Sequence, residues 1–214
     1  LGNLMGVVLF IGAVSARAEL TIEISQGADN PTTIAVVPFA WQGAGAVPED
    51  LAAVVDGDLA RSGQFAPIAR TDMLGKPSTE AEVFYRDWRS LNAEYVLIGR
   101  VSMPGQLRVD YELFDVLRQS KILSGYEAGA AVDARMLAHR VADAVYEKLT
   151  GVPGAFATRL VYISGTRVPG GKDFSRLTMS DSDGARPIVL LETKEPLLAP
   201  TWSPDGKNIA YVSF

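Results

Sequence analysis

Two seven-residue segments near the end of the chain share one pattern, RLVYISG at 159–165 and NIAYVSF at 208–214, with Tyr162 and Tyr211 in register. Two further strand-like segments, SRLTMSDSDG at 175–184 and PIVLLE at 187–192, lie between them among Gly, Pro and Asp turns. A repeat of about 40–50 residues with four short strands is typical of a propeller blade. Residues 159–214 are therefore predicted to form about one blade of an all-β propeller and the start of a second.

The turn before the second copy supports this prediction. Ser203, Pro204, Asp205 and Gly206 stand directly before the strand. Proline presets φ at the second turn position, and glycine accepts a positive φ at the end of the turn. Both faces of the following strand are apolar, which is typical of a strand lying between neighbouring blades.

The part of the chain before the repeat alternates strand-like and helix-like patterns instead. Apolar or alternating runs predict five strands, at 33–39, 65–68, 95–101, 107–113 and about 121–128. Three helix starts are predicted: at Glu49-Asp50 between the first two strands, at the capping box Thr79–Glu82 between the second and third, and at Asp133 after the last. The second helix is expected to bury Phe84, Trp88 and Leu91. The order β-α-β-α-β-β-β-α predicts an α/β domain with a mixed sheet.

The first residues have the features of an export signal. An apolar run from Leu4 to Val14 is followed by Ser15-Ala16-Arg17-Ala18, a small-x-small cleavage motif, so we expect cleavage between Ala18 and Glu19. The run is shorter than the about 20 residues that span a bilayer. No second apolar span follows, so the mature protein is not expected to cross a membrane.

The next residues alternate in polarity. Leu20, Ile22 and Ile24 fall on one side, and Glu19, Thr21 and Glu23 fall on the other, before Gly27–Pro31 breaks the pattern. This segment is either an edge strand of its own sheet or a free arm. The complete predicted organisation is a signal peptide at 1–18, an N-terminal partner-binding arm at 19–30, an α/β domain at 31–150, a linker at 151–158 and an incomplete propeller at 159–214.

Composition excludes several classes of function. The net charge is −5 and no run of Lys and Arg occurs, which argues against nucleic acid as a partner. The chain has no cysteine, which removes disulfides, thiol catalysis and lipidation of an N-terminal cysteine. An exported chain without disulfides suits a bacterial periplasm.

The segment APTWSPDGKNIAYVSF (199–214) resembles the repeat of the TolB family. Prolyl-oligopeptidase-type peptidases and other propellers share that repeat. The export signal, TIAVVPF (33–39), AEYVLIGRV (93–101), a closing helix and the repeats are together similar to the TolB layout over essentially the whole chain. Family members continue through a six-bladed propeller, and this chain holds about one blade and the start of another.

The resemblance implies a periplasmic, non-enzymatic scaffold of the Tol–Pal system that supports outer-membrane integrity and envelope constriction at division. It implies binding of the peptidoglycan-associated lipoprotein Pal through the propeller, mostly through blades absent here, and of the C-terminal domain of TolA through the N-terminal segment. Some bacteriocins use the propeller surface for import. The TolA-binding residues carried over are Glu19, Leu20, Thr21, Ile22, Glu23 and Ile24. No cofactor or metal is implied.

Three other groups carry weak chemical signals. His139, the only histidine, has no matched acid or base nearby in sequence and is expected to be a surface or partly packed residue. Asp181-Ser182-Asp183-Gly184 lacks the later ligands of a calcium loop and is interpreted as a blade turn. Gly170-Gly171-Lys172 lacks the spacing of a phosphate loop.

Two alternative functions remain open. The first is an exported peptidase of the prolyl-oligopeptidase type, whose catalytic domain would lie beyond residue 214 and would carry G-x-S-x-G and a late histidine. The second is a general envelope accessory protein, because IAVVPF followed by YVLIGRV is also similar to lipoprotein cofactor domains; the missing lipidation cysteine counts against it.

Overall fold

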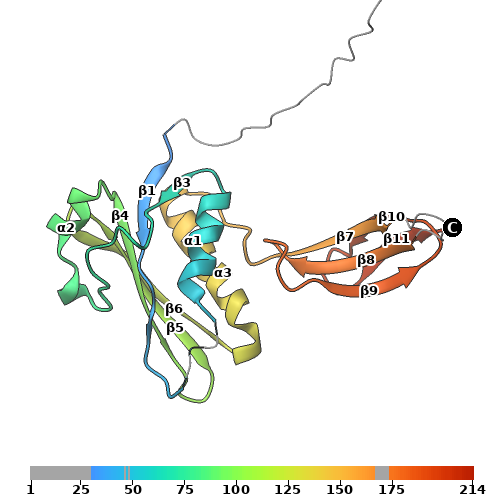
Figure 1. Cartoon of the computed structure of the whole chain (residues 1–214), viewed down its shortest axis with the longest axis horizontal. Coiled ribbons are helices and arrows are strands. Elements are labelled where there is room, and N and C mark those ends of the chain that lie inside the picture. Colours follow the sequence, from blue (N-terminus) through green and yellow to red (C-terminus); the bar gives the residue numbers. More distant parts are fainter. Residues whose placement is uncertain (1–29, 46, 48, 167–173) are drawn as a thin grey trace, which may run out of the picture.

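The computed structural model describes residues 30–45, 47, 49–166 and 174–214, whose helices and strands form two lobes (Figure 1). The α/β lobe contains, in chain order, β1 (Thr32–Val36), β2 (Ala40–Trp41), α1 (Leu51–Arg61), β3 (Phe65–Pro67), a 3-10 turn (Glu80–Glu82), α2 (Tyr85–Ser90), β4 (Tyr95–Ser102), β5 (Leu107–Asp115), β6 (Ser120–Gly129), a second 3-10 turn (Ala131–Asp133) and α3 (Ala134–Thr150). The β lobe contains β7 (Arg159–Thr166), β8 (Phe174–Asp181), β9 (Ile188–Thr193), β10 (Leu197–Trp202) and β11 (Ile209–Ser213).

The sheet of the α/β lobe is mixed, as its pattern predicts. Its strand order is β3-β1-β4-β5-β6, and β2 pairs with the end of β4. Strand β1 runs parallel to β3 and β4, whereas β4, β5 and β6 form an antiparallel meander. The parallel pairs need crossovers, which α1 and the segment containing α2 supply.

Helices α1 and α3 lie side by side on one face of this sheet (Figure 1). Asp50 caps α1 by accepting a hydrogen bond from the Ala53 amide at 3.0 Å, and Gly151 ends α3 with a φ of 75°. The apolar stripes of both helices form the larger core with alternate residues of the strands; its fully buried members include Ile34, Val36, Leu59, Leu97, Leu113, Leu137 and Val141.

The opposite face of the sheet is covered at one end by α2 and the loop before it. Trp88 is buried there as expected, but Phe84 is 67% exposed, so its predicted place in the core is wrong. The 3-10 turn ends at Glu82, and Val83 and Phe84 have extended backbones, so the helical spacing is interrupted before α2 begins. Val83 turns inward instead of Phe84.

The β lobe consists of antiparallel strands of a partial propeller. Strands β7, β8 and β9 form one sheet and β10 and β11 form a hairpin. The turn at 203–206 has the predicted form: Gly206 has a φ of 66°, and its amide donates to the Ser203 carbonyl at 2.9 Å. Tyr211 and Val212 are 42% and 47% exposed among the described residues.

Strand β10 was not expected from the sequence. Ala199 has a φ of 49°, Pro200 has no amide hydrogen, and the pairing register shifts between Leu198 and Thr201. This β-bulge accommodates a proline inside a strand, where a regular ladder would not. Within the described ranges, no helix has both the length and the apolarity needed to cross a membrane.

Candidate functional site: the junction between the lobes

The residues predicted to bind TolA, Glu19–Ile24, lie outside the described residues, as do the cleavage position at Ala18 and the glycine-rich segment 170–172. The described chain begins at Asn30 and enters β1 at once. The Thr33 amide donates to Glu94 Oε1 at 3.0 Å, and the Thr33 hydroxyl donates to the Asn92 carbonyl at 2.6 Å. A segment preceding residue 30 is therefore joined to a strand that is held firmly in the sheet.

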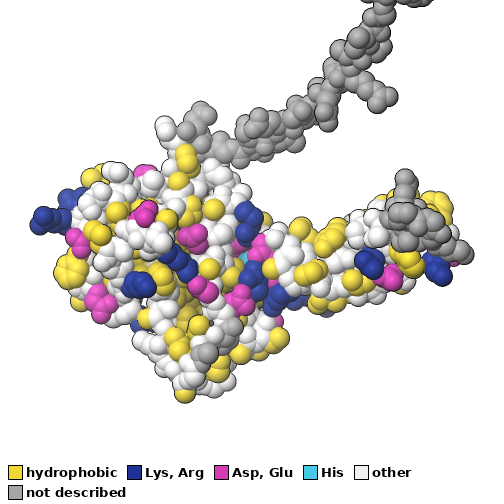
Figure 2. Space-filling model, viewed as in Figure 1, with side chains coloured by type: hydrophobic (Ala, Val, Ile, Leu, Met, Phe, Trp, Pro, Cys, Tyr) yellow, Lys and Arg dark blue, Asp and Glu magenta, His cyan; other side chains and the backbone are white. Residues whose placement is uncertain are grey.

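Figure 2 shows positively and negatively charged side chains gathered where the two lobes meet. Helices α1 and α3 face the turn after β8 there. We refer to the following eight residues as the junction cluster: Glu49, Asp58, Arg61, Arg135, His139, Asp181, Asp183 and Arg186.

Arg135, in the first turn of α3, connects the lobes directly. Its guanidinium donates to Glu49 at 2.8 Å, to Asp181 at 3.4 Å and to Asp183. Glu49 belongs to the α/β lobe, and the two aspartates belong to the β lobe. The side chain of Arg135 is only 15% exposed, so these ion pairs are poorly screened by solvent.

Arg186 holds the same aspartate from the other side. It donates from Nε and a terminal nitrogen to the two oxygens of Asp181, at 2.8 and 3.0 Å, in the bidentate geometry that suits a carboxylate. It also donates to the carbonyl of Val132 in the α/β lobe at 3.1 Å. The positive φ of Arg186, 50°, is thus found at a residue that contacts both lobes.

His139 is completely buried, so the expectation of a surface or partly packed residue is wrong. Its Nδ1 lies 2.6 Å from Oδ2 of Asp58, which is also completely buried and pairs with Arg61. No residue close to His139 in sequence supplies an acid, but Asp58 of α1, 81 residues earlier, does so in the folded protein. The packing of α1 against α3 brings the two residues together.

The aspartates of the turn after β8 are part of a blade turn, as interpreted, and they also form ion pairs. The pKa of Asp183 lies below its usual value: burial acts to raise it, but the Ala185 amide and the charge of Arg135 outweigh burial. The pKa of Arg135 lies above its usual value: burial acts to lower it, but the hydrogen bond to Glu49 and the Asp183 carboxylate oppose this. Both shifts favour the charged pair.

The linker is held by the same helix that carries His139. Asp143 accepts hydrogen bonds from the amides of Phe156 at 2.7 Å and Ala157 at 3.0 Å. The ring of Phe156 meets Tyr146 edge to face, with centroids 5.6 Å apart. The chain leaving α3 therefore turns back onto α3 before β7 begins.

We expect Asp143→Ala to destabilise this return by about 2 kcal/mol, because two backbone donors lose a charged acceptor. Hydrogen exchange at the Phe156 and Ala157 amides should then accelerate by at least about tenfold. Glu147→Ala is the matched control, since Glu147 lies one turn later on the exposed side of α3. Equal exchange rates in the two variants would contradict the assignment.

One feature of the sequence indicates a buried ion pair in the junction cluster. Asp58 stands in the apolar stripe of α1, four residues after Val54 and beside Leu59, where a charged residue needs a buried partner. The identity of that partner has no local signal, because Asp58, His139 and Asp181 are far apart in sequence.

An α/β domain followed by propeller strands, joined by a network of ion pairs, defines a class of two-domain proteins. The family model for the TolB amino-terminal domain matches residues 20–122, and that for the TolB beta propeller domain matches residues 146–214. The chain belongs to the TolB family.

Curated relatives agree with this assignment. The chain is 42% identical over 213 residues to the "Tol-Pal system protein TolB" of Pseudomonas syringae pv. tomato, covering 99% of this chain and 49% of the relative. It is 49% identical over 203 residues to the protein of the same name from Marinomonas sp., covering 94% and 47%. The chain thus spans about half the length of the curated relatives it matches.

A solved structure supports the fold. The crystal structure of TolB from Acinetobacter baumannii matches with a TM-score of 0.74 at 32% identity, covering 90% of this chain and 46% of that one.

Proposed function

We propose that this chain acts as a protein-binding scaffold of the Tol–Pal system in the periplasm, without catalytic activity of its own. The observation that carries the proposal is the two-domain TolB architecture, found in relatives named for that system. The charged groups of the junction cluster are paired with one another, which supports a structural role for them.

Within this proposal the arm Glu19–Ile24 binds the C-terminal domain of TolA, and the propeller binds Pal. The alternation of Leu20, Ile22 and Ile24 with polar residues suits the addition of a strand to the sheet edge of a partner. The arm precedes β1 in the chain, and β1 belongs to the α/β lobe, whose helices contact the β lobe. Roles in outer-membrane integrity, envelope constriction at division and bacteriocin import belong to the same proposal.

The arm is tested with the chain beginning at Glu19, by calorimetric titration against the C-terminal domain of TolA. Replacing Leu20, Ile22 and Ile24 together with asparagine should weaken binding by at least about 100-fold, because the apolar anchors of an interface carry most of its free energy. The matched control replaces the polar side instead, with Glu19→Gln, Thr21→Ser and Glu23→Gln, and should bind within about fivefold of the parent.

Circular dichroism and the melting temperature of both variants should equal those of the parent, since all helices and strands of the described lobes begin after residue 30. Unchanged affinity in the apolar variant would show that the arm is not the TolA-binding segment.

A further inference from the structure

His139 is the single histidine of the chain, and one of its nitrogens has no partner among the described residues. Nδ1 lies 2.6 Å from Oδ2 of Asp58, within hydrogen-bond distance, and an ionised carboxylate there would accept a proton from Nδ1. Nε2 is fully buried and has no hydrogen-bond partner in the described part of the chain; Oδ2 of Asp181, the acidic oxygen that faces it there, lies 3.9 Å away. In a neutral imidazole, the Nε2 lone pair would face this anion.

The charges around His139 come from every element packed against it. The α/β lobe supplies Glu49 before α1 and Asp58 and Arg61 on α1, its own helix supplies Arg135, and the β lobe supplies Asp181, Asp183 and Arg186. These seven residues comprise four carboxylates and three guanidiniums. One negative charge is left over beside a buried imidazole, and a proton on Nε2 would balance it.

We propose that His139 is a buried imidazolium that links Asp58 of the α/β lobe to Asp181 of the β lobe, so that its proton controls how firmly the two lobes are held together. The inference concerns the junction alone and is independent of which partners the arm and the propeller bind. His139 acts here as a positioning residue for the two domains.

A divalent cation is the competing explanation of the bare nitrogen. Ligand atoms of His139, Asp181 and Asp183 lie within 4.8 Å of one another, and a histidine held by a carboxylate is common in metal sites. Both oxygens of Asp181 already bind Arg186, however, and Asp183 binds Arg135. The three guanidiniums and four carboxylates of the cluster carry one net negative charge. A doubly charged cation added to them would leave one net positive charge. A single proton satisfies the same nitrogen and leaves the cluster neutral.

The pH dependence has a definite sign. Histidine is the side chain whose charge ordinarily changes between about pH 5 and 8. In the proposed arrangement a protonated His139 holds the junction at low pH, and loss of that proton at higher pH loosens the junction.

Nitrogen NMR of the tag-free chain tests the protonation directly, because a single histidine gives a single pair of ring signals. We expect both ring nitrogens to show the shifts of protonated nitrogens at about pH 6, and Nε2 alone to lose its proton as the pH rises. A neutral ring with a proton only on Nδ1 at that pH would overturn the proposal. It would also be overturned if added Zn²⁺ bound stoichiometrically to Nε2 in the metal-free protein.

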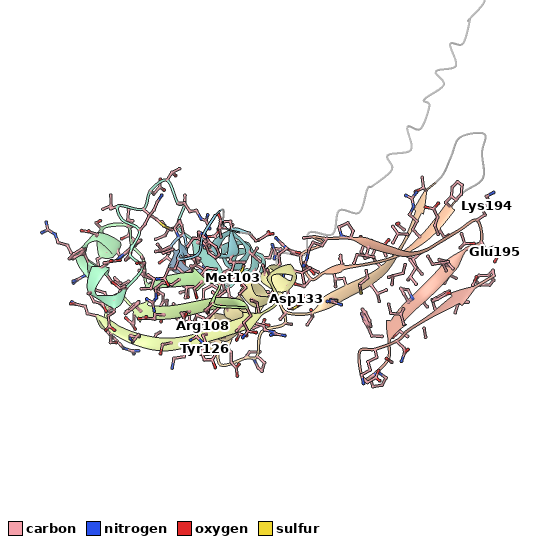
Figure 3. All side chains as sticks on the ribbon, turned by 90° about the horizontal axis from the view of Figure 1, so that it is seen from below. Met103, Arg108, Tyr126, Asp133, Lys194 and Glu195 are labelled. Atoms are coloured by element: carbon pink, nitrogen blue, oxygen red, sulfur yellow. The ribbon has the colours of Figure 1, made fainter. Side chains whose placement is uncertain are left out.

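Spin-label distances test the effect on the lobes. The chain has no cysteine, so Leu117→Cys and Lys194→Cys place one label on each lobe, both at exposed positions. Lys194 lies at the end of the β lobe far from the α/β lobe (Figure 3). We expect a narrow distance distribution at about pH 6 that broadens as the pH rises past about 8.

The same labelled chain with His139→Gln is the control, because glutamine cannot take the proton. Its distribution should be broad and should not change over this pH range. A pH response that persists in His139→Gln would assign the effect to other groups and overturn the proposal. If that variant fails to fold, the NMR measurement on the unmodified ring decides alone.

Discussion

Arg135→Met should lower the free energy of unfolding by about 3 kcal/mol, because it removes the cation shared by three carboxylates. Asp181 and Asp183, which are mostly buried, would each lose a positively charged partner. Methionine retains much of the length and apolar contact of the arginine stem, so the loss reports the charge. Urea denaturation followed by tryptophan fluorescence measures the change, since Trp88 lies in the α/β lobe and Trp202 in the β lobe.

Arg140→Met is the matched control for Arg135→Met. Arg140 lies on the same helix, is 51% exposed and, among the described residues, has a single ion-pair partner, Glu127, at 3.8 Å. Exposed pairs of this kind contribute little, so we expect a change within about 0.5 kcal/mol. Equal losses in the two variants would show that Arg135 does not hold the junction.

The acid range gives a second readout of the same variant. Because the pKa of Asp183 is lowered in the folded protein, its contribution to stability is present above the usual carboxyl range and is lost as the pH falls through the lowered value. Removing Arg135 removes one cause of that shift. The slope of stability against pH should therefore be shallower below about pH 4 in Arg135→Met.

Asp58→Asn should destabilise the protein by a similar amount, about 3 kcal/mol, because His139 and Arg61 lose a buried anion and the new amide places two donors beside them. The loss should be measured at neutral pH by urea denaturation. The ring signals of His139 should shift in the same variant, since Nδ1 loses its charged acceptor.

Asp56→Asn makes the same chemical change two residues earlier on α1. Burial raises the pKa of Asp56, so folding makes its charged form less favourable than in the unfolded chain. Replacing it should leave stability unchanged or raise it slightly. A loss equal to that of Asp58→Asn would mean that α1 tolerates an amide poorly at either position and would remove the case for a specific Asp58–His139 pair.

Much of the α/β lobe was predictable because its signals are local. The period of apolar residues in α1 and α3 and the apolar runs of β1 and β4 depend on neighbours within one or two turns. The capping box at Thr79–Glu82 forms as expected, yet the helix it should start is broken at Val83 and Phe84. Packing against the sheet decides which of these two side chains is buried, and no local pattern contains that information.

The sequence by itself determined the class of each lobe, because hydrophobic period and turn residues specify helices, strands and tight turns over short distances. Only the tertiary structure decided the chemistry of the junction. His139 and Asp58 are 81 residues apart, and Arg135 is 48 residues from Asp183, so their pairing depends on how α1, α3 and the turn after β8 meet. A buried charge is stable only when such distant partners converge, and the packing of the lobes brings them together.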